Sequence, residues 1–455
     1  MSRPSPPLTV ERLREDVEAD LIDTVIVAFT DMQGRLQGKR IHGSHFVDEV
    51  LPHGTEACNY LLAVDVDMNT VDGYSMSSWS TGYGDFVLQP DLSTLRMIPW
   101  LDGTALVIAD LEWHGAAPVV ASPRQILKRQ LEALAAQGMG AFVGTELEFI
   151  VFEDSYEDAW DEDYRHLTPM NRYNVDYSIM GGTKVEPLLR AIRRGMTGAG
   201  MTVESAKGEC NLGQHEIAFK YTDALATCDN HVLYKTGSKE IASEFGCSLT
   251  FMAKFDQREG NSCHIHLSFR GADGSAVMAD DSGTHGMTPL GEAFVAGQIA
   301  RMKELSLLFA PNINSYKRFQ AGSFAPTAIK WGHDNRTCAL RLVGHGHGLR
   351  LENRVPGGDV NPYLAVAGMI AAGLDGIERG LTLEAPFEGN AYESDAEHVP
   401  SSIGASRDLW SGSEWIRDTF GADVQAHYTN MAQVEIDAFG ATVTNWERRR
   451  GFERL

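Results

Sequence analysis

The chain has 455 residues, with 62 acidic and 39 basic side chains, and it carries a formal charge of −23 at pH 7. Hydrophobic residues make up 43% and charged residues 22%, which is typical of a globular protein with a sizeable core and excludes a disordered chain. Because so negative a protein repels phosphate backbones, the composition argues against nucleic acid as a partner.

No segment indicates export or membrane insertion. The N-terminal segment is polar and lacks the continuous apolar stretch of a signal peptide. The most apolar run, residues 364–374, is shorter than the ~20 residues that span a bilayer, and it contains glycine. The six cysteines are scattered without a C-x-x-C pair, which is typical of a reducing compartment. We therefore expect a cytoplasmic protein with no membrane partner.

The N-terminal quarter of the chain is rich in predicted strands. Two apolar runs predict strands at residues 22–30 and 104–113. A change to a composition rich in Pro, Ala and Gly follows the second run. We therefore expect two domains, a smaller one at 1–115 and a larger one at 116–455.

The larger domain opens with a predicted helix. Ser122 is a suitable N-cap, Pro123 fits the first helical position, and Gly138 ends the apolar periodicity. Between the later helices lie short strands with alternating polar residues, so we expect an α+β fold with antiparallel strands around a polar pocket. These helices are expected at 184–199, 288–309, 361–380 and 413–437.

Three of the short strands direct polar side chains to one face each. In residues 142–152, a period of two places Glu146 and Glu148 together and leaves an apolar face opposite. The other two strands are CHIHLSF and LENRV. Their same-face residues are His264, His266 and Ser268 in the first, and Glu352 and Arg354 in the second.

Carboxylates recur on these polar segments, since KGECNLGQHEI adds Glu209 and Glu216. For a lone E-x-E pair, an exposed strand face is the commoner explanation. Five carboxylates that converge on one cavity require counter-charge, and hard divalent cations such as Mg²⁺ or Mn²⁺ supply it. Both ions tolerate one imidazole ligand. The H-x-H pair also fits zinc or two hydrogen-bonded core histidines, but no cysteine cluster favours zinc.

Arginines accompany the acidic segments at positions 318, 336, 341 and 354. Each could pair with a structural acid, but as a group they are suited to carboxylate and phosphate groups. Two metals with several arginines form the electrostatic clamp of phosphoryl transfer. The sequence contains neither a P-loop nor a Rossmann fingerprint, and GHGHG at 344–348 is interpreted as a glycine loop.

In chain order, these segments resemble the glutamine synthetase superfamily over nearly the whole length. Each segment alone is a weak signal, but the ordered set is specific. The resemblance implies an N-terminal β-grasp domain, a C-terminal catalytic domain, and a homo-dodecamer of two hexameric rings with active sites between neighbouring subunits. The segments are FTDMQGRLQGKRI, GDFVLQPDLSTLRMIPW, GTELEF, GECNLGQHE, MAKFDQREGNSCHIHLS, PNINSYKR, WGHDNRT, LENRVPGGDVNPYLAVAGMIAAGL and VTNWERRRGFERL.

The resemblance also implies a role for each candidate residue, in a reaction where the glutamate γ-carboxylate attacks ATP and an amine displaces phosphate from γ-glutamyl phosphate. The implied groups are one metal site (Glu148, Glu209, Glu216), a second metal site (Glu146, His264, Glu352), ATP contacts (His266, Ser268, Arg341), glutamate contacts (Gly260, Arg318, Arg354) and a group that stabilises the transferring phosphoryl (Arg336).

The chain departs from the ammonia-using members at the acceptor site. Their flap carries a glutamate just before Ala-Pro, and this chain has Phe324 there. A second acid, expected from the neighbouring subunit, is best matched by Asp72, with Asp65 or Asp67 as alternatives. Glu259 stands in the N-G-S-G segment, where the family's asparagine contact to glutamate is therefore in doubt.

We expect Phe324 to mark an organic amine acceptor in place of ammonia, because an aromatic ring offers apolar and cation–π contacts but takes no proton. A small monoamine such as ethanolamine is favoured, and a polyamine comes next. Two alternatives stay open: a glutamine synthetase that uses ammonia, and an inactive structural or regulatory member of the superfamily.

Overall fold

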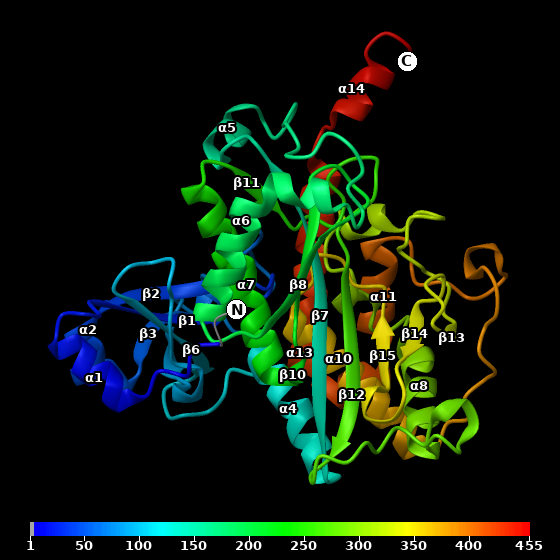
Figure 1. Ribbon diagram of the computed structural model, residues 1–455, viewed down its shortest axis with the longest axis horizontal. Helices are drawn as coiled ribbons and strands as arrows, with labels where there is room; N and C mark the ends of the chain where they lie inside the picture. Colours follow the sequence, from blue (N-terminus) through cyan, green and yellow to red (C-terminus); the bar gives the residue numbers. More distant parts are fainter. Residues whose placement is uncertain (1–3) are drawn as a thin grey trace.

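The computed structural model describes residues 4–455, which contain two β-sheets (Figure 1). The smaller, six-stranded sheet lies in the N-terminal part, with the order β2-β1-β6-β4-β3 and β5 paired to β6. β1 and β6, the strands predicted at 22–30 and 104–113, are parallel to each other, and the other pairs are antiparallel. The strands are β1 (Thr24–Thr30), β2 (Leu36–His42), β3 (Thr55–Cys58), β4 (Asp85–Pro90), β5 (Arg96–Met97) and β6 (Thr104–Glu112).

The larger, nine-stranded sheet has the order β13-β14-β15-β12-β7-β9-β8, and β10 and β11 also pair with β7. Long strands β7 and β12 run side by side through the molecule (Figure 1). All pairs are antiparallel except β13 with β14, which confirms the predicted α+β fold. The strands are β7 (Met139–Phe152), β8 (Val203–Gly208), β9 (Gln214–Phe219), β10 (Thr222–Asp223), β11 (Ser248–Thr250), β12 (Cys263–Gly271), β13 (Trp331–His333), β14 (Leu340–Val343) and β15 (Arg350–Asn353).

Alternation along β7 decides which face the helices cover. Val143, Leu147 and Phe149 are at most 1% exposed, and helix α7 (Ala224–Glu244) packs on their side. The ring of Phe149 meets Tyr234 of α7 with centroids 6.5 Å apart. Burying each such apolar side chain stabilises the fold by about 1.5–3 kcal/mol. The opposite face of β7, which carries the two glutamates, is left for a polar site.

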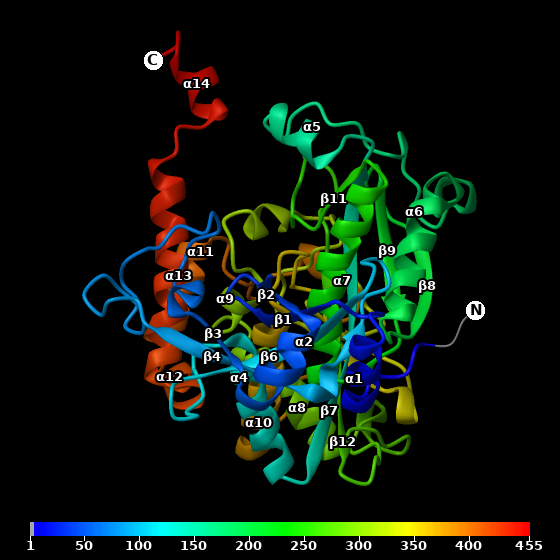
Figure 2. The same cartoon turned by 90° about the vertical axis from the view of Figure 1, so that its left-hand side faces the viewer.

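Helix α10 (Pro362–Arg379) is buried along most of its length and packs against helices α4, α7 and α8. It contains the apolar run 364–374, whose apolarity is explained by the core. Within residues 4–455 no helix is long and apolar enough to cross a membrane. Figure 2 shows α13 and α14 along one side of the molecule, with α14 extending from the body. The remaining helices are α1 (Val10–Glu18), α2 (Gly43–His45), α3 (Leu51–His53), α4 (Pro123–Ala136), α5 (Tyr156–Asp161), α6 (Ile179–Gly198), α8 (Pro289–Arg301), α9 (Ser306–Phe309), α11 (Ile403–Gly412), α12 (Glu414–Phe420), α13 (Ala422–Ala441) and α14 (Asn445–Gly451).

Two of the predicted helices are interrupted. The stretch 413–437 divides into α12 and α13 because Gly421 has φ of 95°, which ends a right-handed helix. The stretch 288–309 divides into α8 and α9 through a tight turn in which the Ser306 amide donates to the Lys303 carbonyl. Ser122 precedes α4 as predicted, but its side chain forms no capping hydrogen bond.

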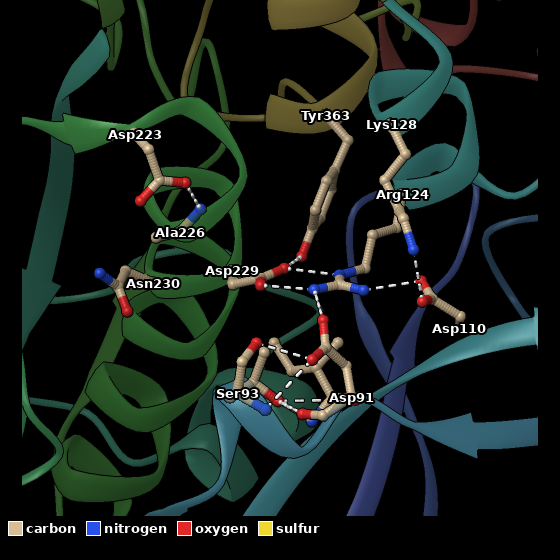
Figure 3. Close-up of polar contacts among 12 residues, drawn as sticks. Asp91, Ser93, Asp110, Arg124, Lys128, Asp223, Ala226, Asp229, Asn230 and Tyr363 are labelled. Atoms are coloured by element: carbon tan, nitrogen blue, oxygen red, sulfur yellow. Dashed lines mark hydrogen bonds and ion pairs between the residues drawn. The ribbon is translucent and has the colours of Figure 1, made fainter. Parts of the chain in front are cut away.

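A buried arginine joins the N-terminal sheet to the rest of the chain (Figure 3). Arg124, at the start of α4, is 2% exposed. Its Nε and Nη2 donate to both oxygens of Asp229 on α7, each at 3.0 Å. Its Nη1 lies 2.6 Å from Asp110 on β6, and its Nη2 lies 2.7 Å from Asp91 after β4. One guanidinium therefore links both parts of the molecule.

Two further groups complete this network, which we name the Arg124 cluster (Arg124, Lys128, Asp91, Asp110, Asp229 and Tyr363). Lys128 Nζ lies 2.7 Å from Asp110, and the Tyr363 hydroxyl on α10 donates to Asp229 at 2.6 Å. The neighbouring aspartates hold the pKa of Arg124 above its usual value, in spite of its burial. The cluster satisfies its charges with the chain's own side chains.

Candidate active site

A cavity of about 230 Å³, the carboxylate cavity, opens on the polar face of the larger sheet. Strands β7, β9 and β12 form one part of its wall, and loops that follow α9 and β13 form another. Most residues that the sequence suggested for metal, glutamate and phosphoryl contacts meet here. The predicted residues among its lining are Glu146, Glu148, Glu209, Glu216, Gly260, His264, Phe324, Arg336, Arg341 and Arg354.

Strand register brings these side chains together. Glu146 on β7 lies opposite His264 on β12, and Glu148 lies opposite Glu216 on β9. Glu352 on β15 lies opposite His266 on β12. Residues directly opposite each other in antiparallel strands share one face at about 5 Å, so the alternation of each strand places its polar groups in a common site.

Glu148, Glu209 and Glu216 form the first carboxylate group. One oxygen from each lies within 4.8 Å of the others, a spacing that suits a metal ion. Glu148 is held by the Ser262 amide at 2.6 Å. Lys207 on β8 forms ion pairs with Glu209 and, at 3.4 Å, with Glu216.

The first group is short of positive charge. Burial raises the pKa of Glu216 to about 8, Lys207 opposes this shift, and the negative charges of Glu146 and Glu148 add to it. A buried carboxyl whose pKa is raised beside other acids is typical of functional sites, and a bound cation would supply the missing positive charge.

The second group contains Glu146, Glu352 and two histidines. His264 Nδ1 lies 3.5 Å from Glu146 and 3.4 Å from Glu352, and His266 Nε2 lies 3.0 Å from Glu146. Burial raises the pKa of Glu146, but hydrogen bonds from the two histidines outweigh it and hold that pKa well below its usual range. The Nε2 atom of His264 is buried and has no hydrogen-bond partner in the part of the chain that the structure describes. The Nδ1 atom of the same ring faces both carboxylates, and an imidazole nitrogen among carboxylates suits a divalent cation.

The positions of the two histidines differ from the roles that the resemblance implied, which were a metal ligand for His264 and an ATP contact for His266. A compact ligand set joins Glu146 and Glu352 with His266, the residue expected at ATP, although His264 contacts the same two glutamates. His266 and Ser268 line an adjoining cavity of about 290 Å³, which we name the nucleotide cavity because the resemblance implies ATP contacts for these two residues. Glu146, which His266 contacts, lines both cavities and connects them.

The four candidate arginines differ in how deeply they lie relative to the carboxylate cavity. Arg341 and Arg354 form ion pairs with buried Glu352 at 2.9 and 2.5 Å. Arg336 lines the carboxylate cavity and has no ion pair within residues 4–455. Arg318 is 1% exposed and donates to the carbonyls of residues 354 and 355, so its head group lies behind the cavity wall.

Gly260 allows a close backbone approach at the cavity wall. A Cβ atom at this position would lie 2.0 Å from the Ala253 carbonyl oxygen, so only glycine fits. Its own carbonyl accepts a hydrogen bond from Gln214 at 2.9 Å. The backbone here is fixed on both sides, which suits a ligand contact made by the main chain.

Phe324 lies on the loop after residue 318, with 53% of its surface exposed and a left-handed φ of 55°. Such a φ is rare for a bulky residue and costs roughly 1 kcal/mol or more. Asp72, Asp65 and Asp67 do not line the carboxylate cavity within this chain. Their predicted place is in the site of a neighbouring subunit, and it stays a prediction.

Sequence reasoning missed several cavity residues. Asp176, Tyr177 and Cys210 line it, and Asp176 Oδ2 accepts a hydrogen bond from the Cys210 thiol at 3.5 Å. Ligand atoms of Asp176, Glu209 and Cys210 lie within 4.8 Å of one another. Asp176 stands in an irregular segment without periodicity, and no local signal assigns it.

Comparison with known proteins gives consistent matches. Residues 120–451 match the family model "Glutamine synthetase, catalytic domain". The chain is 64% identical to gamma-glutamylethanolamide synthetase GlnA4 of Streptomyces coelicolor, over 99% of this chain and 97% of the relative. It is 34% identical to glutamate–isopropylamine ligase of a Pseudomonas species, over 96% and 97% of the two chains.

A solved structure has the same fold. The complex of GmaS with ADP superimposes with a TM-score of 0.85 at 27% identity, covering 97% of this chain and 99% of the other. These relatives match the chain from the N-terminal sheet to the C-terminal helices.

Proposed function

Because this chain belongs to the glutamine synthetase family, we propose that it joins L-glutamate to a small primary amine, ethanolamine foremost, at the expense of ATP. The product is a γ-glutamylamide, formed through γ-glutamyl phosphate. The observation that carries the choice of an amine over ammonia is Phe324, which lines the carboxylate cavity where ammonia-using members have an acid. The two relatives whose names specify amines support it.

Ligases of this family use ATP and divalent cations, and the residues here fit such ions. The oxygen-rich first group (Glu148, Glu209 and Glu216) would hold one Mg²⁺ or Mn²⁺. The second group (Glu146, Glu352 and one or both histidines) would hold another, and the Nδ1 atom of His264, which faces both carboxylates, is consistent with it. When bound, the cations would neutralise phosphate and carboxylate oxygens.

The arginines and the main chain would orient the reactants. Glutamate would bind at Gly260 and Arg354, with Arg318 supporting the wall from behind. Its γ-carboxylate attacks the terminal phosphorus of ATP, and ADP leaves. Arg336 faces the cavity without an internal partner, which leaves its guanidinium available for the charge on the transferring phosphoryl group.

The acceptor amine poses a separate problem, because it arrives protonated and must lose a proton before it attacks. Phe324 can contact the amine through its ring but cannot take the proton. Asp176 lines the same cavity beside Glu209 and is placed to bind the ammonium group and accept that proton. Attack of the neutral amine on the acyl phosphate then releases inorganic phosphate. Asp72 of a neighbouring subunit is retained as a second acid.

A homo-dodecamer of two hexameric rings remains part of the proposal, as does a cytoplasmic location. All six cysteines are free, which supports a reducing compartment.

A phosphate-release assay with glutamate, Mg²⁺-ATP and a panel of acceptors tests the proposal. The panel contains ethanolamine, isopropylamine, putrescine and ammonia, and mass spectrometry identifies the product. We expect ethanolamine to give the highest kcat/KM and ammonia to be poor by at least about a hundredfold, because each lost binding contact costs tenfold or more. Turnover with ammonia alone would contradict the proposal in favour of a glutamine synthetase. No turnover with any acceptor, together with no binding of Mg²⁺-ATP, would favour an inactive member of the family.

Two variants separate the acceptor roles. Phe324→Glu should move the preference toward ammonia, because it restores a base at the flap. Asp176→Asn should raise KM for ethanolamine about tenfold or more and leave KM for ATP unchanged. The matched control is Asp163→Asn, which changes an exposed aspartate elsewhere on the surface. Equal loss in the control, or an altered KM for ATP, would contradict the role of Asp176.

A further inference from the structure

A third cavity, of about 470 Å³, lies between the N-terminal sheet and the larger part of the chain and shares no lining residue with the carboxylate cavity. We name it the junction cavity. Its walls come from the N-terminal segment at Ser5–Pro7, the strand that begins with Arg96, the end of α6, the loop at Lys220–Thr222 and α7. Neither the family match nor the resemblance assigns a role to it.

The charge of this cavity is opposite to that of the protein. Among residues 4–455 its lining includes partly buried Arg96 and exposed Lys220 but no aspartate or glutamate, although the chain as a whole carries −23. Within residues 4–455 neither cation forms an ion pair, since no carboxylate oxygen lies within 4 Å of its nitrogens. A cavity with positive groups and no acids concentrates anions.

Arg96 is partly buried, and its hydrogen bonds within residues 4–455 go to neutral groups. Its Nε donates to the Thr94 carbonyl at 2.9 Å, and its Nη1 donates to the Asn230 side-chain oxygen at 2.6 Å. Its Nη2 makes no hydrogen bond within the described residues. Burial lowers the pKa of Arg96, and nearby Asp229 opposes this only in part.

Asp229 cannot serve as the direct partner of Arg96. Both of its oxygens are bound by Arg124, and one also accepts the Tyr363 hydroxyl. Figure 3 shows Asp229 directed toward Arg124, with Asn230 beside it on the same helix. Within residues 4–455 the direct partners of this partly buried guanidinium are a carbonyl and an amide, which favours an anion from outside.

The cavity also adjoins the nucleotide cavity. Tyr221 lines both, and its ring meets Phe142 of the nucleotide cavity with centroids 6.2 Å apart. A ligand that moves Tyr221 would therefore change a wall of the nucleotide cavity.

We propose that the junction cavity binds a small multiply charged anion, bearing carboxylate or phosphate groups, between Arg96 and Lys220, and that this binding changes the affinity for nucleotide through Tyr221. The active site is filled first with Mg²⁺-ADP and glutamate, so that its own arginines are occupied. Isothermal titration calorimetry then measures binding of succinate, citrate, phosphate and pyrophosphate, with chloride as the reference anion. Binding of succinate and citrate would identify the ligand as a carboxylate, and binding of phosphate and pyrophosphate would identify it as a phosphate. Either result supports the proposal.

Variants locate the site. Lys220→Gln should weaken the anion about tenfold, because one charge-assisted bond is lost. Lys184→Gln removes an exposed lysine elsewhere and should leave the affinity unchanged. Arg96→Gln should abolish binding, but it could disturb packing, so Lys220→Gln carries the test. Tyr221→Ala should uncouple the anion from ADP affinity without loss of the anion.

No anion binding to the filled enzyme would overturn the proposal, as would equal affinities in wild type and Lys220→Gln. An ADP affinity unaffected by a bound anion would overturn the coupling. The experiment does not depend on which amine the enzyme uses, so its failure is distinguishable from failure of the proposed function.

Discussion

The Arg124 cluster and the carboxylate cavity are both assembled from acids far apart in the sequence, but they obtain their counter-charge differently. In the Arg124 cluster three aspartates meet Arg124 and Lys128 at 2.6–3.0 Å. In the carboxylate cavity a carboxyl has its pKa raised to about 8, and among residues 4–455 a buried histidine nitrogen has no hydrogen-bond partner. Charges that pair with side chains of the same chain stabilise the fold, whereas charges that lack such partners favour the binding of ligands.

The strongest test of this contrast removes the internal cation. Arg124→Met should lower the free energy of unfolding by about 3–5 kcal/mol, because it leaves Asp229 buried without its partner. Urea denaturation measures the change. The control Arg193→Met breaks a more exposed pair with Glu186 and should cost less than about 1 kcal/mol. A comparable loss in both variants would show that burial does not increase the contribution of the Arg124 cluster to the free energy of unfolding.

A substitution in the carboxylate cavity should instead lower activity and leave the free energy of unfolding nearly unchanged. Glu216→Gln should reduce kcat/KM for ATP by about a hundredfold or more, since it removes a predicted metal ligand. In metal-free protein at pH 7 it should change the unfolding free energy by less than about 0.5 kcal/mol, because a carboxyl with a pKa of about 8 is already protonated there. A large loss of stability without a loss of activity would contradict the cation-binding role.

The pH dependence of metal binding follows from the same carboxyl. The raised pKa of Glu216 means that the metal-free protein holds this proton below pH 8, and a divalent cation must displace it. Mn²⁺ affinity should therefore rise about tenfold per pH unit, or about 1.4 kcal/mol, from pH 6 toward pH 8 and then level off. Titrations at pH 6.5, 7.5 and 8.5 measure this slope. In Glu216→Gln the slope should be absent, and a slope retained in that variant would assign the proton to another group.

The sequence predicted the cavity better than the Arg124 cluster, and the reason is local periodicity. Glu146 and Glu148 could be placed on one face because β7 alternates, and His264 and His266 because β12 does. Antiparallel register then brought the strands together. No such pattern links Arg124 to Asp229, which is 105 positions away, so their contact arises only from packing.

Other features were missed for related physical reasons. Asp176 lies on an irregular segment and reaches the cavity only through the path of its loop. The division of the helix at 413–437 had a signal in Gly421, but a glycine is also tolerated inside helices. Arg318 was expected at glutamate because of its motif, and its depth behind the wall depends on the packing of neighbouring carbonyls. The domain boundary at 115 stays a prediction.

The smallest expected effect separates the buried and exposed members of the Arg124 cluster. Lys128 is 32% exposed on its side chain and touches Asp110, which Arg124 already binds at 2.6 Å. Lys128→Met should therefore lower the unfolding free energy by less than about 1 kcal/mol, and added salt should reduce that loss, since the pair is partly screened by water. Urea denaturation at low and high ionic strength measures both. A loss equal to that of Arg124→Met would show that the two cations act as one unit, and would place the stabilising charge on Asp110 in place of buried Asp229.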